Sequence, residues 1–577
     1  MVNTKDTRGL KRGLTHYGDR GFSLFLRKSF AMSMGYSEAD FDRPIIGIAN
    51  TSSGFNNCHR SVPDLVEAVK RGVMYAGGLP VDFPTISLGE PYLNPTSMLF
   101  RNLMAMDTEE MIRAQPIDAV VLIGGCDKTI PAQLMAAASA NIPAISLAVG
   151  PMLTGSWRGE RLGACTDCRR QWGRSRAGEL DDQEIIDVGQ QLSTTAGTCM
   201  VMGTASTMAL MTEALGMMLP GSATVPAVHA ERLRIAEATG ERAVELIEEN
   251  LIPSSIINEF SLSNAFRVML AVGGSTNALI HMTAVAGRLG IKVDLQKLDD
   301  MSRNTPVIVD LKPSGENYME DLFRAGGLGP ILRELRPLLH LDCMTITGQT
   351  LGDHIPKSLS WAQEVVKPID EPLKEEGGIV VLQGNLAPGT AIIKHSAATP
   401  ELLQHEGRAV VFENLEDLAE RIDDPNLDVK EDDVLVLRNA GPKGAPGMPE
   451  SGYIPIPKKL AEAGVKDMVR ISDARMSGTA FGTIVLHICP ESYVGGPLGL
   501  VQNGDRIVLD VKGRRLDLAV DQETLAQRRR EWVAPSPPIG SERGYLRLHL
   551  EQVEQASEGC DLKILKGSST GVVTPVL

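Results

Sequence analysis

The chain has 577 residues, of which 43% are apolar and 22% charged, as expected for a folded protein of roughly two to four domains. This composition excludes a disordered tail, a collagen-like chain and a small disulfide scaffold. The formal net charge of −15 argues against broad binding to nucleic acid or anionic membranes, and 4% aromatic residues leave few stacking surfaces for bases.

The N-terminal part of the chain alternates short apolar runs with helical patterns. Residues 44–50, 117–124 and 143–149 are typical of buried strands, and residues 62–76, 97–114 and 132–140 of helices. Strands that alternate with helices predict parallel sheets, whose ligands lie at the carboxyl ends of the strands.

The most apolar stretch is residues 200–220. It contains Glu213 and is interrupted by Gly203 and Gly216, so it predicts a Met-rich core helix rather than a membrane span of about 20 apolar residues. Residues 228–300 are expected to be mostly helical. The N-terminus has no apolar core typical of a signal peptide, and we expect a cytoplasmic protein.

Prolines and charged residues at 353–378 predict a domain boundary, which we place between residues 1–365 and 366–577. The second part contains short β-rich runs divided by Gly- and Pro-rich turns, a pattern that favours a closed or nearly closed β-structure with some helices. These runs are residues 379–382, 408–412, 433–437, 468–471, 483–487 and 506–511.

The eight cysteines, in a chain without an export signal, are expected to be free thiols or metal ligands. Cys165 and Cys168 form a C-x-x-C pair, but no second pair or histidine follows nearby to complete a zinc site. A thioredoxin-like motif would open a helix, whereas the arginines that follow here predict a polar loop. We therefore expect a structural or incidental role for this pair.

Three separated cysteines are more informative. Cys58 and Cys126 lie in loops directly after predicted strands, and Cys199 lies at the start of the predicted Met-rich helix. A helix N-terminus favours a thiolate. Three thiolates at one sheet edge could hold an iron–sulfur cluster with one open iron position that acts as a Lewis acid. From spacing alone, the alternative is that each cysteine is a small buried hydrophobe.

Charged residues surround these cysteines. Asp127 and Lys128 follow the second cysteine, Glu90 ends another β-like run at 83–88, and Glu450 lies in a Gly/Pro-rich loop of the second part. Carboxylates that converge from several loops suit Mg²⁺, although each alone is also consistent with a solvated loop residue.

Ser477 follows the strand-like run at 468–471 and precedes a glycine, in a turn that can expose its hydroxyl. Such a serine is usually a hydrogen-bonding residue, and it becomes a proton-transfer candidate only beside a strong positive field. Arg475, two residues earlier, is a candidate for orienting an acidic substrate.

Six ordered motifs extend over nearly the whole chain, at residues 125–129, 198–207, 273–277, 384–388, 441–450 and 473–478. At these residues the sequence closely resembles the dihydroxy-acid and sugar-acid (aldonate) dehydratase family of iron–sulfur hydro-lyases. Residues 100–103, 109–118 and 150–160 are similar to its L-arabinonate/D-xylonate dehydratase branch.

This resemblance implies the cofactors and their ligands. Cys58, Cys126 and Cys199 would bind the cluster, [2Fe–2S] rather than the alternative [4Fe–4S]. Mg²⁺ would be bound by Glu90, Asp127 and Glu450, joined by Lys128 as a carbamate, because a free lysine cation would repel the metal. Ser477 would be the catalytic base.

The resemblance also implies the architecture and the assembly. The fold would be α/β, with parallel sheets in an N-terminal region (1–365) that binds the cluster and Mg²⁺. A C-terminal β-barrel-like domain (366–577) with flanking helices would carry the catalytic serine. The partners would be a small-molecule acid substrate and further copies of the chain, as a homodimer or homotetramer, with no nucleic acid or membrane.

The implied reaction is dehydration of a 2,3-dihydroxy carboxylic acid, such as arabinonate or xylonate, to a 2-keto-3-deoxy acid. The alternative is a dihydroxy-acid dehydratase that acts on 2,3-dihydroxyisovalerate-type substrates in branched-chain amino-acid synthesis. The sequence around Cys58 and the loop 163–180 depart from the pattern of the aldonate branch, which leaves the preferred acid open. A P-loop enzyme is disfavoured because the chain contains no Gly-Lys dipeptide.

Overall fold

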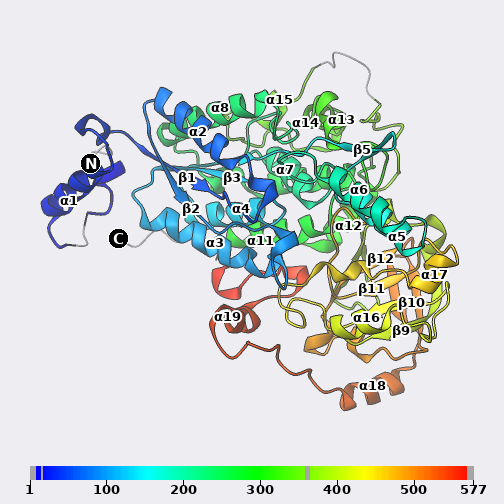
Figure 1. Ribbon diagram of the computed structural model, residues 1–577. Helices are drawn as coiled ribbons and strands as arrows, with labels where there is room; N and C mark the ends of the chain where they lie inside the picture. The colour runs from blue at the N-terminus through cyan, green and yellow to red at the C-terminus, as the bar shows by residue number, and fades with distance from the viewer. Residues whose placement is uncertain (1–7, 15–16, 358–363, 568–577) are drawn as a thin grey trace.

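The computed structural model describes residues 8–14, 17–357 and 364–567 (Figure 1). Its N-terminal region is built on a parallel four-stranded sheet in the order β2-β1-β3-β4. The strands are β1 (Ile45–Asn50), β2 (Leu79–Pro84), β3 (Ala119–Gly124) and β4 (Ala144–Ala148). The predicted parallel sheet is therefore confirmed. It could be predicted because buried parallel strands carry continuous apolar runs, which the sequence displays.

Helices cover both faces of this sheet. In Figure 1, α2 (Val62–Tyr75) and α8 (Ala230–Glu249) lie above it, and α4 (Thr129–Ala140) lies below with α3 (Ser97–Ala114) packed against it. Two glycines let α2 and α8 approach closely. A Cβ on Gly72 would lie 1.9 Å from the carbonyl oxygen of Glu237, so no larger residue fits there.

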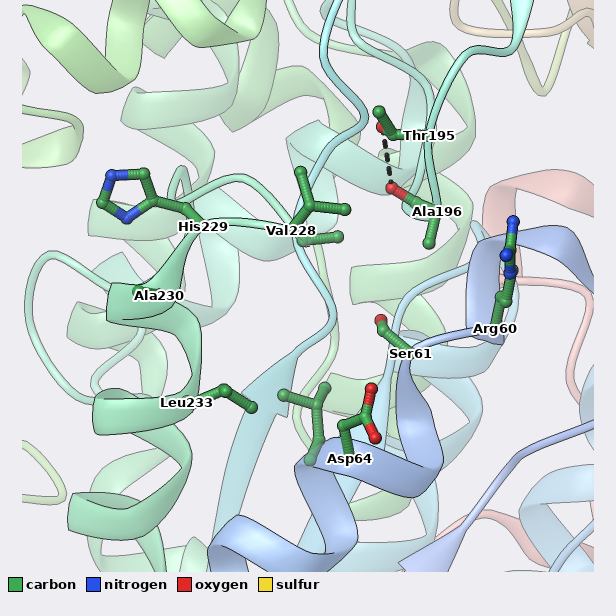
Figure 2. A pocket seen from close by; sticks show the side chains of 11 residues that line it. Arg60, Ser61, Asp64, Thr195, Ala196, Val228, His229, Ala230 and Leu233 are labelled. Atoms are coloured by element: carbon green, nitrogen blue, oxygen red, sulfur yellow. Dashed lines mark hydrogen bonds between the residues drawn. The ribbon is translucent and has the colours of Figure 1, made fainter.

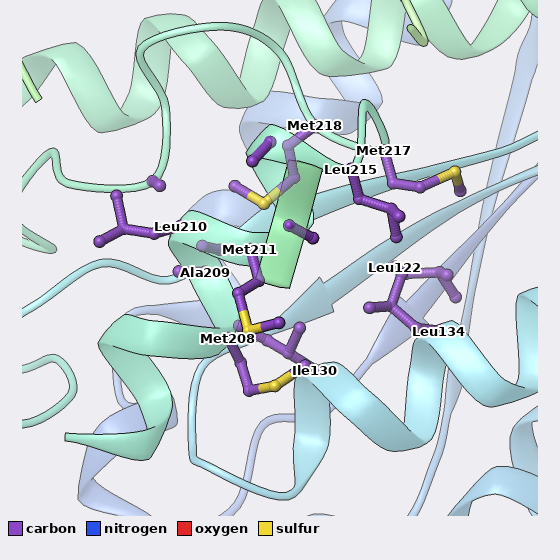
Figure 3. Packing of buried hydrophobic residues seen from close by; sticks show 14 of the residues in the cluster. Leu122, Ile130, Leu134, Met208, Ala209, Leu210, Met211, Leu215, Met217 and Met218 are labelled. Carbon is purple, nitrogen blue, oxygen red and sulfur yellow. The ribbon is translucent and has the colours of Figure 1, made fainter. Parts of the chain in front are cut away.

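The predicted Met-rich helix is shorter than expected. Helix α7 (Thr204–Ala214) is buried at every residue, but the chain is extended at Gly203 and turns at Gly216, whose φ is +92°. The prediction of a helix over 200–220 is therefore wrong in extent. Met208 and Met211 pack in one cluster with Ile130 of α4, which joins α7 to the sheet layer (Figure 3).

The predicted helical region that follows is confirmed. It contains α9 (Pro253–Ile256), α10 (Glu259–Ala271), α11 (Thr276–Arg288) and α12 (Leu295–Arg303) after α8. The remaining N-terminal elements are α1 (Arg20–Ser33), β5 (Gly155–Trp157), β6 (Glu160–Leu162), α5 (Thr166–Arg176), α6 (Asp182–Leu192), α13 (Met319–Arg324), α14 (Leu328–Glu334) and α15 (Leu351–His354).

The C-terminal region is an eight-stranded mixed sheet in the order β14-β13-β9-β10-β11-β12-β8-β7. Its strands are β7 (Val380–Leu382), β8 (Thr390–Ile393), β9 (Gln404–Phe412), β10 (Val434–Leu437), β11 (Arg470–Ser472), β12 (Ile484–Cys489), β13 (Arg506–Asp510) and β14 (Arg515–Leu518). A bridge between Gln383 and Arg515 joins the two edge strands, so the sheet is a nearly closed barrel, as expected.

Helices flank this barrel and the chain then returns to the N-terminal region. The flanking helices are α16 (Leu415–Arg421), α17 (Lys458–Glu462), α18 (Gln522–Glu531) and α19 (Gly544–Gln552). Arg101 of α3 donates to the carbonyl oxygens of Gly559 and Cys560, and Arg288 forms a buried ion pair with Asp561 at 2.6 Å. Within the described residues, no helix is both long and apolar enough to cross a bilayer.

Candidate active site

The carboxyl ends of β1 and β3 carry two of the three predicted cluster cysteines. Cys58 lies in a short 3-10 helix (Asn57–His59), and Cys126 lies two residues after β3. The two thiols are hydrogen-bonded to each other. This contact, followed by burial, raises the pKa of Cys58 well above its usual value.

His59 fixes the loop that carries Cys126. Its Nδ1 donates to the carbonyl oxygen of Thr51 at 2.9 Å, and its Nε2 accepts from the backbone N–H groups of Gly125 and Cys126 at 3.1 and 3.0 Å. Burial lowers the pKa of His59 to about 4, so the ring is neutral and can accept both bonds. Sequence reasoning missed this residue, although it directly follows a candidate ligand.

Cys199 lies apart from that pair, beside Cys165. The two sulfurs are 3.3 Å apart, and Cys168 donates its thiol hydrogen to the carbonyl oxygen of Cys165 at 2.6 Å. The polar loop predicted after Cys165 is wrong: the chain forms helix α5, which Cys165 caps and which contains Cys168.

The expected effect of helix N-termini on the cluster cysteines is also wrong. Helices α2, α4 and α7 begin at Val62, Thr129 and Thr204, so each begins at least three residues after its cysteine. The helix dipole acts within the first turn, and these thiols lie outside it. Their environment is set by loops instead.

The predicted Mg²⁺ ligands come together. Oxygen atoms of Glu90, Asp127 and Glu450 all lie within 4.8 Å of one another, and in the described parts of the chain no other group of three or more His, Cys, Asp or Glu side chains meets that limit. The three cysteines therefore do not form so tight a group. The β-like run predicted at residues 83–88 is misplaced, because strand β2 ends at Pro84. Glu90 instead begins a short 3-10 helix (Glu90–Tyr92).

Lys128 is fully buried at the centre of these carboxylates. Its Nζ contacts Asp127 and lies 3.4 Å from Glu90 and 3.8 Å from Glu450. Burial opposes its charge, as does Arg475, but the three carboxylates outweigh both and raise the pKa of Lys128. Burial likewise opposes ionisation of Glu90, but Lys128 and Arg475 hold the pKa of Glu90 well below its usual value. A lysine cation thus occupies the position that a metal would need.

Arg475 links this group to the C-terminal region. It donates to Glu450 at 2.6 Å and to the hydroxyl of Thr96 at 2.7 Å, and Thr96 donates in turn to Glu90 at 2.6 Å. Ser97 also donates to Glu90. Both terminal nitrogens of the guanidinium group are used by the protein, which favours a role in holding the carboxylates over a role in orienting a substrate.

Ser477 lies two residues beyond Arg475. Its hydroxyl is hydrogen-bonded to that of Thr479 at 2.8 Å, and the Thr479 carbonyl oxygen accepts from Thr166 at 2.9 Å. Asn277 donates to the carbonyl oxygen of Met476 at 2.9 Å. The serine turn is thus held from both sides by side chains of the N-terminal region.

Close packing also fixes this turn. A Cβ on Gly478 would lie 2.5 Å from Ser275, and one on Gly203 would lie 2.6 Å from the Thr479 methyl group. Gly203 comes four residues after Cys199, so the turn extends from the carboxylate group towards the segment of the third cysteine. Close packing therefore explains why glycine stands at these two positions of the sequence motifs.

Lys394 is a second buried lysine, and sequence reasoning missed it. Its Nζ donates to the carbonyl oxygen of Gly478 at 3.1 Å. Burial lowers the pKa of Lys394 to about 7. Burial thus disfavours its positive charge, which is fully present beside the serine turn only below about pH 7.

Two cavities lie next to the cysteine loops. One of about 440 Å³ is lined by Arg60, Asp64, Thr195 and His229, and Figure 2 shows these side chains around its walls. The other, of about 630 Å³, is lined by the loop after β1, Arg60 and Tyr92. None of the eight predicted site residues lines either cavity, but Arg60 and Tyr92 lie two residues from Cys58 and Glu90.

Known proteins match the chain over most of its length. Residues 43–354 match the family described as dihydroxy-acid/6-phosphogluconate dehydratase, N-terminal, and residues 364–560 match its C-terminal counterpart. The L-arabinonate dehydratase of Rhizobium leguminosarum bv. trifolii is 47% identical over 96% of this chain and 95% of its own. The 6-deoxy-6-sulfo-D-gluconate dehydratase of Pseudomonas putida is 42% identical over 96% of both chains.

A more distant relative is named for a different substrate. The dihydroxy-acid dehydratase of Carboxydothermus hydrogenoformans is 38% identical over 94% of this chain and 99% of its own. The protein described here is thus a hydro-lyase of the dihydroxy-acid/6-phosphogluconate dehydratase family, as the sequence motifs predicted.

Proposed function

We propose that this enzyme removes water from an aldonic sugar acid, such as arabinonate or xylonate, and releases a 2-keto-3-deoxy acid. The observation that carries this proposal is the group of three carboxylates joined through Arg475 to the turn that holds Ser477. The higher identity to sugar-acid dehydratases (47% and 42%) than to a dihydroxy-acid dehydratase (38%) supports a sugar acid over 2,3-dihydroxyisovalerate.

The carboxylate group fits Mg²⁺ in donor type, since Mg²⁺ prefers oxygen ligands. Glu90, Asp127 and Glu450 would hold it. Lys128 fits only if it loses its positive charge, because its Nζ lies among the same oxygens. Carbamylation would convert Lys128 from a cation into a fourth oxygen ligand, and we propose that form for the active enzyme.

The cysteines fit a binuclear cluster. Cys58 and Cys126 are in contact, as two ligands of one iron would be, and Cys199 comes from a different segment. This division supports [2Fe–2S] with one position open, with [4Fe–4S] as the alternative. His59 would keep the Cys126 loop in place whichever cluster is bound.

When bound, Mg²⁺ and the cluster would act as Lewis acids, on the substrate carboxylate with its 2-hydroxyl and on the leaving 3-hydroxyl respectively. Ser477 would take the proton from carbon 2. Its hydroxyl is a weak acid, so it needs positive charge nearby. The chain itself supplies Arg475 in the same turn, and Lys394 beside it where the pH is low enough to keep that lysine protonated. Thr479 would orient the serine oxygen through its hydrogen bond.

We further propose that the enzyme is cytoplasmic and forms a homodimer or homotetramer, with a small acid as its only other partner. Support for self-association comes from helix α1, which projects from the rest of the chain in Figure 1. Phe25 and Phe30 on this helix are more than half exposed. Exposed aromatic side chains of this kind are typical of contacts between subunits.

A panel assay tests the substrate. The Mg²⁺-loaded enzyme is given pentonates, hexonates and 2,3-dihydroxyisovalerate, and release of 2-keto acid is measured. We expect the highest kcat/KM on a sugar acid, and a preference for 2,3-dihydroxyisovalerate would contradict this. A ¹³C carbamate signal from wild-type enzyme in labelled bicarbonate, absent from Lys128→Arg, tests the modified lysine.

A further inference from the structure

Three cysteines lie together at the start of helix α5. The sulfur of Cys165 lies 3.3 Å from that of Cys199, and the thiol of Cys168 donates to the backbone carbonyl oxygen of Cys165. The proposed reaction uses Cys199 but neither of the other two. Cys165 and Cys199 are separated by 34 residues along the chain, so their contact is made by the fold and not by a local motif.

The surroundings hold these two sulfurs together. Cys165 and Cys199 pack against one apolar cluster that contains Met152, Met200 and Tyr318. The α5 end is also fixed, because buried Asp167 accepts from Gly163, Tyr318 and Lys312 at 2.7, 2.8 and 3.1 Å. A disulfide bond needs a sulfur–sulfur distance of about 2.05 Å, so closure asks for a movement of only a little over about 1 Å.

We propose that, when the cluster is absent, Cys165 and Cys199 form a reversible disulfide that keeps Cys199 in a protected form. The oxidant is a disulfide of the glutathione class. One cysteine thiolate attacks it, forms a mixed disulfide and releases one glutathione thiol. The second cysteine then attacks the mixed disulfide and releases the other. The two cysteines lose two protons and two electrons, and the oxidant gains both.

This disulfide and the cluster exclude each other. A sulfur that is bonded to Cys165 is no longer a thiolate and cannot bind iron. The oxidised chain would therefore be unable to accept a cluster until a dithiol reduces it. This consequence rests on the proposed role of Cys199 as a cluster ligand, whereas formation of the disulfide itself does not.

The first experiment uses the full chain, freed of iron by a chelator under reducing conditions and then desalted. It is exposed to oxidised glutathione, alkylated and digested without reductant, and the masses of its peptides are measured by mass spectrometry. We expect a linked Cys165–Cys199 peptide in the wild type and in Cys168→Ser, and none in Cys165→Ser. A dominant Cys165–Cys168 or Cys58–Cys126 link, or no link at all, would overturn the proposal.

The second experiment follows cluster reassembly with ferrous iron and sulfide by visible absorption. The oxidised wild type should recover at least about tenfold more slowly than the same protein treated with dithiothreitol, whereas Cys165→Ser should recover equally with and without that treatment. If the linked peptide forms but the cluster reassembles at the same rate, the disulfide does not block a cluster ligand. The assignment of Cys199 as a cluster ligand is then wrong. If only the proposed substrate or the proposed base Ser477 is wrong, the linked peptide and the slow cluster reassembly should still be observed.

Discussion

Arg475 donates to Glu450 across 2.6 Å, and it lies only two residues before Ser477 in the same turn. One side chain therefore connects a proposed metal ligand to the proposed base. Between Glu450 and the serine there are thus one hydrogen bond and two residues of backbone.

Loss of this connection should destabilise the protein. Arg475→Met leaves Glu450 and Glu90 without their guanidinium partner, and removal of one member of a buried ion pair costs about 3–5 kcal/mol. Because both carboxylates are partly exposed, we expect about 2 kcal/mol in urea unfolding without Mg²⁺, together with a large fall in kcat. Arg475→Lys, which keeps the charge, should recover part of the stability. Wild-type stability in Arg475→Met would show that the pair contributes little.

Ser477→Ala should separate proton transfer from cofactor binding. The serine hydroxyl contacts Thr479 and no cysteine, so the visible absorption of the cluster should be unchanged. Loss of a general base typically reduces the rate by about 10²–10⁴-fold, and kcat should fall within that range. Ser314→Ala, which removes a hydroxyl that is hydrogen-bonded to Ser396, is a matched control and should keep normal turnover. Normal turnover in Ser477→Ala would assign the base to another group.

The two proposed cofactor sites should respond to different substitutions. Cys126→Ser should remove the cluster absorption and the bound iron together with activity. Glu450→Gln should keep the cluster absorption and the bound iron. It should raise the Mg²⁺ concentration needed for activity by at least about tenfold, because it replaces a charged oxygen ligand by a neutral one. Iron analysis and magnesium titration of each variant provide the check. A coloured, active Cys126→Ser enzyme would refute the cluster assignment.

The sequence predicted three of the N-terminal strands well, for a physical reason. Strands β1, β3 and β4 are buried on both faces and so carry continuous apolar runs that stand out from their surroundings. Strand β14 was missed because Arg515 and Asp517 alternate with its two leucines, and a four-residue alternation is too short to identify. Strand β8 was also missed, and it is likewise only four residues long.

Helix α5 could not be predicted because it is very polar and its position depends on distant residues. Asp167, in its first turn, is bound by Lys312 and Tyr318, which lie about 150 residues away in sequence. The same holds for the contact of Cys165 with Cys199 and for Lys394 beside Gly478. Adjacent residues such as Asp127 and Lys128 could be grouped from the sequence, and the family resemblance grouped Glu90 and Glu450 with them, whereas these other contacts between distant segments required the fold.

Lys394 provides a test by pH. Burial lowers its pKa to about 7 in the folded protein, below its value near 10.5 in the unfolded chain. Between these values the unfolded chain binds more protons, so this lysine destabilises the fold fully below about pH 7 and progressively less as the pH rises towards 10.5. Its contribution to the slope is at most about 1.4 kcal/mol per pH unit.

Lys394→Met should therefore flatten the rise in stability with pH while it removes the hydrogen bond to Gly478. Unfolding by urea at about pH 6.5 and about pH 9 should show a wild-type gain that the variant lacks. Its kcat should fall and its KM should change little, because the lysine holds the turn of Ser477 and does not contact the carboxylate group. Lys430→Met, at an exposed lysine, is the control and should follow the wild type. An identical pH dependence in Lys394→Met would mean that Lys394 is not the group that titrates.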